Sequence, residues 1–177
     1  MVTSRTFLGA QTWAMPRGAF ASAAALIAQA EAPHAPEVAV GIERGGRELA
    51  SRVAGLLNIP AAFVPARHND SDQVGIQASG RVRVEARAIE QLPTAGRLLL
   101  LDDICGSGAT LRTLIAVITG LRAPTSIRTA VLCRNVGAGF TPDSWVWDVS
   151  DWVCFPWEDQ PTHRTEPLPA PRLVHHP

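Results

Sequence analysis

Residues 98–111, LLLLDDICGSGATL, decide the fold class of this chain. Four consecutive leucines are typical of a short buried strand. Two carboxylates follow directly, and then a run of small residues that turns the chain. The next stretch, ATLRTLIAVITGL (109–121), has the apolar spacing of a helix. The order of strand, small-residue turn and helix predicts one βα unit of an α/β protein.

Strands and helices also alternate on both sides of this unit. Short apolar runs predict strands at 38–42, 61–65 and 126–133, and helical spacing predicts helices at 19–32 and 47–57. This alternation predicts an α/β fold with a parallel sheet and helices on both of its faces. Ligands of such sheets bind beyond the carboxyl ends of the strands. Two unusual segments, ERGG and DDICGSGAT, follow strands directly and therefore lie at such ends.

The remaining segments organise the chain around one predicted domain, 1–158. The polar stretch 66–80 is interpreted as a long loop of the kind that forms lids or binding loops. RVRVEA (81–86) alternates as an exposed strand does, and 145–158 is expected to hold a short strand and a turn. The Pro- and His-rich residues 159–177 are interpreted as an extended tail.

Composition excludes some classes of function. The chain has 177 residues, 46% of them hydrophobic, and a formal net charge of zero, which argues against nucleic acid as a partner. All 16 basic residues are Arg, so any cation in a binding site is a planar guanidinium. The three cysteines form no CxxC pair. With no apolar run of membrane-spanning length or signal-peptide type, we expect a cytoplasmic protein that does not bind membranes.

The carboxylates and the small-residue loop suggest a specific ligand. Asp102 and Asp103 can accept hydrogen bonds from vicinal hydroxyls, and the loop 106–110 can point backbone N–H groups at a phosphate. Ser107 and Thr110 add hydroxyl donors. Together these groups fit a ribose that carries a 5′-phosphate, whereas an ordinary capped βα turn is the alternative interpretation. The GxxxxGK[ST] and GxGxxG patterns are both absent.

This segment resembles the signature of the type I phosphoribosyltransferases, which bind 5-phosphoribosyl 1-diphosphate (PRPP). The resemblance spans residues 20–158 and implies a Rossmann-like fold with a small hood built from N- and C-terminal segments. It also implies that Asp102 and Asp103 hold the ribose hydroxyls. The residues implied to hold the phosphate are Ile104, Cys105, Gly106, Ser107, Gly108, Ala109 and Thr110.

VAVGIERGGRELA (38–50) resembles the diphosphate loop of the same family. Gly45 and Gly46 allow the backbone to approach an anion closely, and Arg44 supplies charge-assisted donors. In the family a strained, often cis, peptide occurs in this loop, which corresponds here to Glu43–Arg44. The resemblance therefore adds Glu43, Gly45 and Gly46 to the PRPP site and Arg44 to the catalytic set with the two aspartates.

DWVCFPWE (151–158) resembles the base-binding end of the 6-oxopurine enzymes, especially the xanthine–guanine and archaeal hypoxanthine types. This resemblance implies that Trp152 stacks on a purine, that the main chain at Trp152 and Val153 reads its edge, and that Ile104 covers the other face. Arg134 corresponds to a Lys that donates to the purine oxygen, although it can equally be a surface Arg at a strand end. The resemblance also implies that Glu158 or Asp159 holds a second magnesium ion through water. Trp145 and Trp147 are interpreted as core residues.

One position departs from the family pattern. The 6-oxopurine enzymes carry an Asp near the purine N7 where this chain has Gly106. An imidazole such as His68, or the departing diphosphate, could accept the proton instead. Alternatively, the acceptor is a modified base or another ring nitrogen. The 66–80 loop corresponds to the family's lid, from which Arg67 or His68 could touch diphosphate.

The resemblance implies an enzyme that moves phosphoribosyl from PRPP, with Mg²⁺, to a purine-like base and releases diphosphate. It also implies a homodimer. Three alternatives remain open: a regulator that senses PRPP or nucleotide without turnover, an assembly protein with a vestigial site, and an enzyme that uses a different nitrogen acceptor in specialised metabolism.

Overall fold

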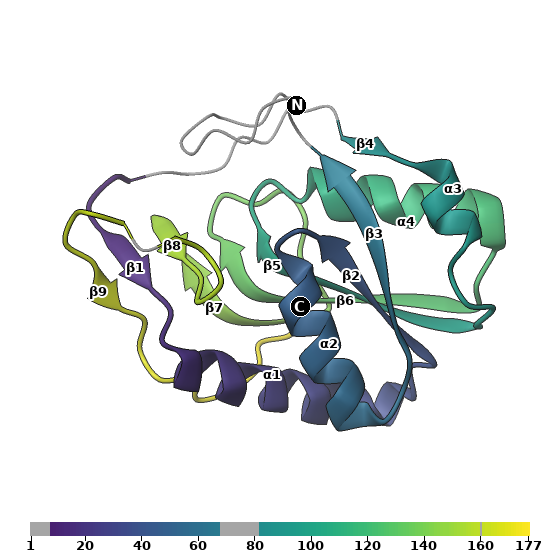
Figure 1. Cartoon of the computed structure of the whole chain (residues 1–177), viewed down its shortest axis with the longest axis horizontal. Coiled ribbons are helices and arrows are strands. Elements are labelled where there is room, and N and C mark those ends of the chain that lie inside the picture. Colours follow the sequence, from purple (N-terminus) through teal and green to yellow (C-terminus); the bar gives the residue numbers. More distant parts are fainter. Residues whose placement is uncertain (1–7, 68–81, 160) are drawn as a thin grey trace.

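The computed structural model describes residues 8–67, 82–159 and 161–177. Two sheets and four α-helices make up this part of the chain (Figure 1). The elements in chain order are β1 (Thr12–Ala14), α1 (Arg17–Glu31), the 3₁₀ turn η1 (Ala32–His34), β2 (Val38–Glu43), α2 (Gly46–Leu57), β3 (Ala61–Arg67), β4 (Arg83–Val84), α3 (Ala86–Glu90), β5 (Arg97–Cys105), α4 (Ala109–Arg122), β6 (Ser126–Asn135), β7 (Ser144–Val149), β8 (Trp152–Cys154) and β9 (Glu166–Pro167).

The large sheet has the strand order β4-β3-β2-β5-β6-β7, and its five longer strands are parallel. The short strand β4 joins the edge antiparallel to β3. Strand β2 connects onward to β3 on one side, whereas β5 connects onward to β6 on the other. The carboxyl ends of β2 and β5 therefore form the point at which the order reverses, where sheets of this kind bind ligands.

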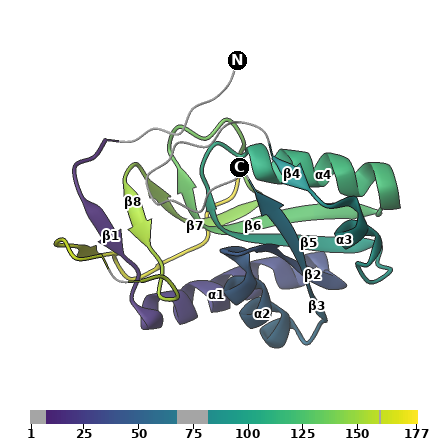
Figure 2. The same ribbon diagram turned by 45° about the horizontal axis from the view of Figure 1, so that its top comes forward.

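Helices cover both faces of this sheet, with α1 and α2 on one side and α3 and α4 on the other (Figure 2). The leucines of β5 explain this arrangement, because successive side chains of a strand point to opposite faces. Leu99 and Leu101 pack with α1 and α2, and Leu98 and Leu100 pack with α4. The predicted α/β fold with a parallel sheet is confirmed. No helix in the described ranges is long and apolar enough to cross a membrane.

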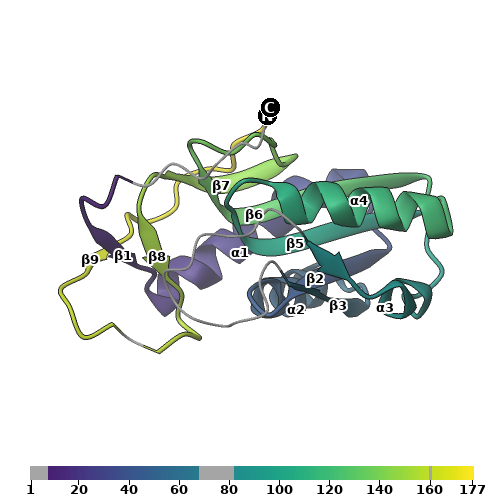
Figure 3. The same ribbon diagram turned by 90° about the horizontal axis from the view of Figure 1, so that it is seen from above.

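The small sheet has the order β8-β1-β9 and joins the N-terminal segment to two C-terminal ones. It lies beyond the end of the large sheet at which β5 and β6 finish (Figures 1 and 3). Hydrogen bonds from Met15 to Cys154 and from Leu168 to Ala14, of 2.9 and 2.8 Å, hold it together. The implied hood of N- and C-terminal segments is confirmed.

Two local predictions were wrong. The expected strand at 81–86 is a strand only at Arg83–Val84, and helix α3 begins at Ala86. The segment ARAIE is made of helix formers and buries Ile89 against α4, which outweighs the short alternating pattern. The expected single strand in 145–158 is two strands in two sheets, because β7 leaves the large sheet before β8 enters the small one.

The Pro-rich segment after 160 lies along the domain. Leu168 is buried next to β1, and the Trp147 indole Nε1–H donates to the Pro169 carbonyl at 3.1 Å. His175 forms a bridge with Trp145 through main-chain hydrogen bonds of 2.7 and 3.2 Å, and its ring stacks on the indole. This contact covers part of β7, the edge strand of the large sheet, which limits pairing with other chains.

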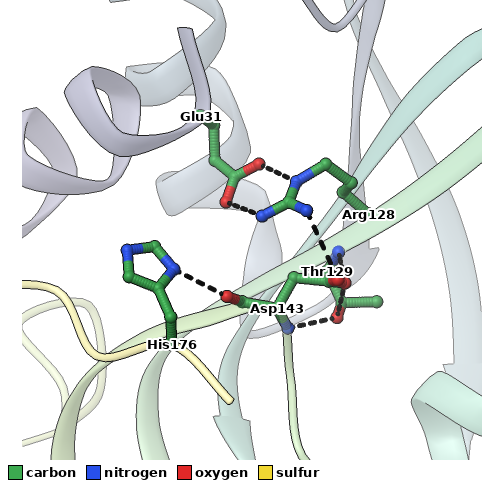
Figure 4. Close-up of polar contacts among 5 residues, drawn as sticks. All are labelled: Glu31, Arg128, Thr129, Asp143 and His176. Carbon is green, nitrogen blue, oxygen red and sulfur yellow. Dashed lines mark hydrogen bonds and ion pairs between the residues drawn. The ribbon is translucent and has the colours of Figure 1, made fainter. Parts of the chain in front are cut away.

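A buried ion pair ties α1 to β6 (Figure 4). Glu31 is fully buried and accepts hydrogen bonds of 2.6 and 3.1 Å from the Arg128 guanidinium. Asp143 extends the network, because its carboxylate accepts from the backbone and hydroxyl of Thr129, each at 2.8 Å. His176 Nδ1 lies 3.0 Å from the Asp143 main-chain oxygen. These bonds join the first helix, a central strand and the C-terminus.

We expect Arg128→Met to lower the free energy of unfolding by about 3 kcal/mol, because it leaves the Glu31 carboxylate buried without a partner. Urea denaturation followed by circular dichroism measures this change. The double variant Glu31→Gln with Arg128→Met removes both charges and should recover most of the loss. Equal stability of the single variant and the wild type would show that the pair does not contribute.

Candidate active site

Two carboxylates mark the end of β5. Asp102 and Asp103 are half-buried, and the Asp103 backbone N–H donates to Asp102 Oδ1 at 3.0 Å. Burial, together with the neighbouring Asp103 charge, raises the pKa of Asp102 well above its ordinary value of 3.8. A carboxyl group that is costly to ionise favours the arrival of donors or a cation. The structure thus places both aspartates at the switch point of the sheet.

A turn of small residues, 106–110, follows these carboxylates, and we call it the phosphate cradle. Gly108 has a φ of +82°, a conformation that favours glycine, and it turns the chain into helix α4 at Ala109. The Ala109 N–H donates to Ser107 Oγ at 3.3 Å. Because the first N–H groups of a helix have no partner within the helix, this turn can bind an anion. Thr110 lies in the first turn of α4 and is half-buried.

The loop 137–140, which follows β6, packs against the cradle. Phe140 packs so closely under Gly108 that a side chain at Gly108 would overlap it. The Arg112 guanidinium donates to the Gly139 carbonyl at 2.7 Å and to the Ser107 carbonyl at 3.4 Å. The contact between the cradle and this loop was not predicted from the sequence. The available signal was a basic residue in the first turn of a helix, where the helix dipole disfavours positive charge.

The loop between β2 and α2 approaches the carboxylates from the neighbouring strand. The peptide between Glu43 and Arg44 is cis, as the resemblance implies. A Cβ at Gly45 would overlap the Asp103 carboxylate, and a Cβ at Gly46 would overlap the Leu101 carbonyl oxygen. Only glycine permits these approaches. The structure therefore brings the ERGG loop into contact with the acid pair.

The residues assigned to a base lie in different surroundings. Ile104 packs against the large hydrophobic cluster to which Val153 also belongs. Trp152 is half-buried on β8. Arg134 donates through Nε to Asp148 Oδ1 at 2.8 Å, and its guanidinium lies 4.0 Å from the centre of the Trp145 ring. Arg134 is thus held against β7.

Glu158 lies close to the ERGG loop. Burial raises its pKa, whereas a hydrogen bond from the Phe155 N–H, 2.8 Å long, and the Arg44 charge oppose the shift. Asp159 is exposed. The described residues contain no cluster of three or more His, Cys, Asp or Glu side chains able to hold a metal ion by themselves. Mg²⁺ commonly binds through one or two carboxylates together with substrate phosphates, and this donor set fits that mode.

The expected lid falls almost wholly outside the described residues. His68 and the rest of 68–81 are not described. Arg67 is the last residue of β3. The possible roles of His68 and Arg67 over the reaction centre therefore stay hypotheses.

Comparisons with known proteins agree on one family. Residues 17–161 match the family model described as "Phosphoribosyl transferase domain". No curated protein matches the chain by sequence.

Solved structures with the same fold include several purine phosphoribosyltransferases. A purine phosphoribosyltransferase of Pyrococcus horikoshii superposes with a TM-score of 0.71 at 21% identity, over 88% of this chain and 99% of that one. A Helicobacter pylori xanthine–guanine–hypoxanthine phosphoribosyltransferase gives 0.65 at 18% identity, over 83% and 90%. A Staphylococcus aureus hypoxanthine phosphoribosyltransferase gives 0.60 at 16% identity, over 76% and 74%. These likenesses show the fold.

Proposed function

Because the chain belongs to the phosphoribosyl transferase family, we propose that it transfers the 5-phosphoribosyl group of PRPP to a purine-like base and releases diphosphate. One observation carries this proposal: the ERGG loop, the acid pair and the phosphate cradle meet at the switch point of the sheet. Each feature occurs alone in many proteins. The contact of the ERGG loop with the acid pair, and the cradle that follows this pair in the chain, support binding of the two ends of one PRPP molecule.

The family resemblance supports the following roles. The N–H groups and hydroxyls of 106–110 hold the 5′-phosphate, and Asp102 and Asp103 accept hydrogen bonds from the ribose 2′- and 3′-hydroxyls. The ERGG loop and Arg44 bind the diphosphate and stabilise the charge that builds on it as the bond to ribose C1 breaks. A base nitrogen then attacks C1 from the opposite side, with inversion. Positioning supplies most of the catalysis.

Magnesium fits this arrangement as a partner of the substrate. When bound with PRPP, Mg²⁺ neutralises charge on the leaving diphosphate. The acid pair at the ribose, and Glu158 or Asp159 through water, are the side chains proposed to lie next to such ions. The raised pKa of Asp102 supports this proposal, because a nearby cation would favour the ionised form of this carboxyl group.

The acceptor side is proposed to use the hood. Trp152 would stack on the base, Val153 would present main-chain groups to its edge, and Ile104 would cover its other face. The Arg134 guanidinium donates to Asp148 in this structure. It is proposed to turn away from that carboxylate and donate to an exocyclic oxygen of the base. Because Gly106 supplies no carboxylate, the departing diphosphate is the proposed proton acceptor.

A different ring nitrogen as acceptor is the second candidate function. Gly106 and Arg134 favour it, since both differ from the residues that the 6-oxopurine enzymes use at these positions. The family resemblance supports a homodimer. The three cysteines are buried and no disulfide joins them, which fits a reducing cytoplasm.

Diphosphate release tests the proposal. The protein is mixed with PRPP and Mg²⁺ and offered guanine, hypoxanthine, xanthine, adenine, 7-deazapurines, orotate and uracil separately. We expect release with one 6-oxopurine and little release without a base. Release only with a 7-deazapurine or a pyrimidine would favour the second candidate. Tight PRPP binding with no release from any acceptor would instead favour a regulator.

A further inference from the structure

We propose that Arg112 is a positioning residue that holds the phosphate cradle in its binding shape and adds positive charge beside it. The proposal rests on the proposed function and deepens it. It assigns to Arg112, and to the loop 137–140, a role in selecting the 5′-phosphomonoester end of the substrate. None of these residues belongs to the PRPP-binding segment recognised in the sequence.

The first argument is the bridge that Arg112 makes. It extends from the first turn of α4 and contacts two loops that are far apart in the chain. One nitrogen donates to the Gly139 carbonyl at 2.7 Å, and another donates to the Ser107 carbonyl at 3.4 Å. Since the guanidinium is planar and rigid, one side chain sets the spacing of the cradle loop from the loop that follows β6.

Side-chain packing also joins the cradle to the loop 137–140. The side chain of Phe140 fills the space under Gly108, where no Cβ would fit. The Cys105 thiol lies 3.7 Å from the Phe140 carbonyl oxygen, within hydrogen-bonding distance for sulfur. Phe140 also packs against the core on the α4 side of the sheet. Packing and hydrogen bonds therefore join these loops, and Arg112 makes the charged contact.

Charge provides the second argument. A cation in the first turn of a helix opposes the helix dipole, so Arg112 is placed there at a cost. Among the described residues it makes no ion pair, and two carbonyl oxygens accept hydrogen bonds from its guanidinium. Arg134, by comparison, is paired with Asp148. Residues 106–110 carry no carboxylate. The charge of Arg112 thus remains available to an anion that enters the cradle.

The Arg112 guanidinium lies beside the cradle, because it donates to the Ser107 carbonyl at 3.4 Å. A dianionic phosphate ester in the cradle would feel this positive charge, whereas diphosphate bound at the ERGG loop would lie at the end of the neighbouring strand.

Separate titrations of ribose 5-phosphate and of diphosphate test this assignment. Calorimetry is performed with the wild type and with Arg112→Gln, which keeps a hydrogen-bond donor but removes the charge and the fork. We expect affinity for ribose 5-phosphate to fall about tenfold and affinity for diphosphate to stay within about twofold. In turnover, KM for PRPP should rise about tenfold with kcat nearly unchanged. Should the Gln variant not fold, Arg112→Lys, which loses one of the two contacts, should weaken ribose 5-phosphate severalfold.

Arg122→Gln is the matched control. Arg122 lies at the other end of α4 and also donates only to carbonyls, those of Ile89, Glu90 and Pro93, at 3.3, 2.9 and 3.1 Å. Its loss should lower stability without changing affinity for ribose 5-phosphate. Unchanged affinity in the Arg112 variant, or an equal loss in the Arg122 variant, would overturn this inference while the proposed function stands. If the wild type binds neither PRPP nor ribose 5-phosphate, both fail.

Discussion

Replacing both Asp102 and Asp103 by Asn is expected to lower kcat/KM for PRPP by about a thousandfold or more while the protein stays folded. The amides keep the shape of the side chains but not the negative charge that is proposed to hold the ribose hydroxyls and any nearby magnesium. The pair lies near the carboxyl end of β5 beside the ERGG loop, so the substitutions remove negative charge from the proposed reaction centre. Diphosphate release at saturating base measures the effect.

Whereas activity should fall, the stability of the protein at pH 8 should rise when Asp102 is replaced by Asn. The pKa of Asp102 is higher in the folded protein than its ordinary value of 3.8, so the folded state binds this proton more tightly than the unfolded state. Wild-type stability therefore falls as pH rises from about 4 through the raised pKa. Asp102→Asn removes this dependence, and its melting temperature should exceed that of the wild type at pH 8 but not at pH 4.

The exposed Glu90, on α3, provides a control for charge removal, since Glu90→Gln should leave both activity and the pH dependence unchanged. Full turnover in the double aspartate variant would exclude this site as the reaction centre. A melting temperature of Asp102→Asn below that of the wild type at pH 8 would show that ionisation of Asp102 does not destabilise the folded protein.

The second large effect is expected from Gly45→Ala. The new methyl group would overlap the Asp103 carboxylate, which is the end of a flexible side chain and can rotate away. The fold should therefore survive, but the carboxylate would leave the position at which it is proposed to bind the ribose. Because a displacement of about 1 Å can cost two orders of magnitude in rate, we expect kcat/KM to fall by two to three orders of magnitude.

Substitutions at two other glycines separate this effect from a loss of stability. A methyl group at Gly46 would meet the Leu101 carbonyl and the Asp102 Cα, which are main-chain atoms of the central strand, so Gly46→Ala should destabilise the fold by about 2 kcal/mol. Gly55, in α2, has open space around it, and Gly55→Ala should be neutral or stabilising. Wild-type activity in Gly45→Ala would contradict the proposed contact between loop and acid.

The parts of the fold that follow from local pattern could be predicted from the sequence. The leucines of β5 and the small residues after Asp103 specify strand, turn and helix within fourteen positions, 98–111. The parallel order of the strands follows from their alternation with helices. Helix α3 was missed because a five-residue helix has too little periodicity to be seen, and it depends on packing against α4.

Contacts between distant segments could not be predicted in this way. Arg112 lies 27 residues from Gly139, and no sequence pattern links them. Arg134 was expected at a base, yet its described contacts are with Asp148 and Trp145, which depend on the register of β6 and β7. The docking of His175 on Trp145 likewise depends on the path of the C-terminal segment.

The most direct test of the central claim is calorimetric titration of PRPP into the wild-type protein with and without Mg²⁺. We predict one PRPP per chain, tighter binding with Mg²⁺ than without, displacement by diphosphate, and no detectable binding to the Asp102→Asn, Asp103→Asn variant. Absence of PRPP binding by the wild type, or equal binding by the folded variant, would contradict the assignment of this site.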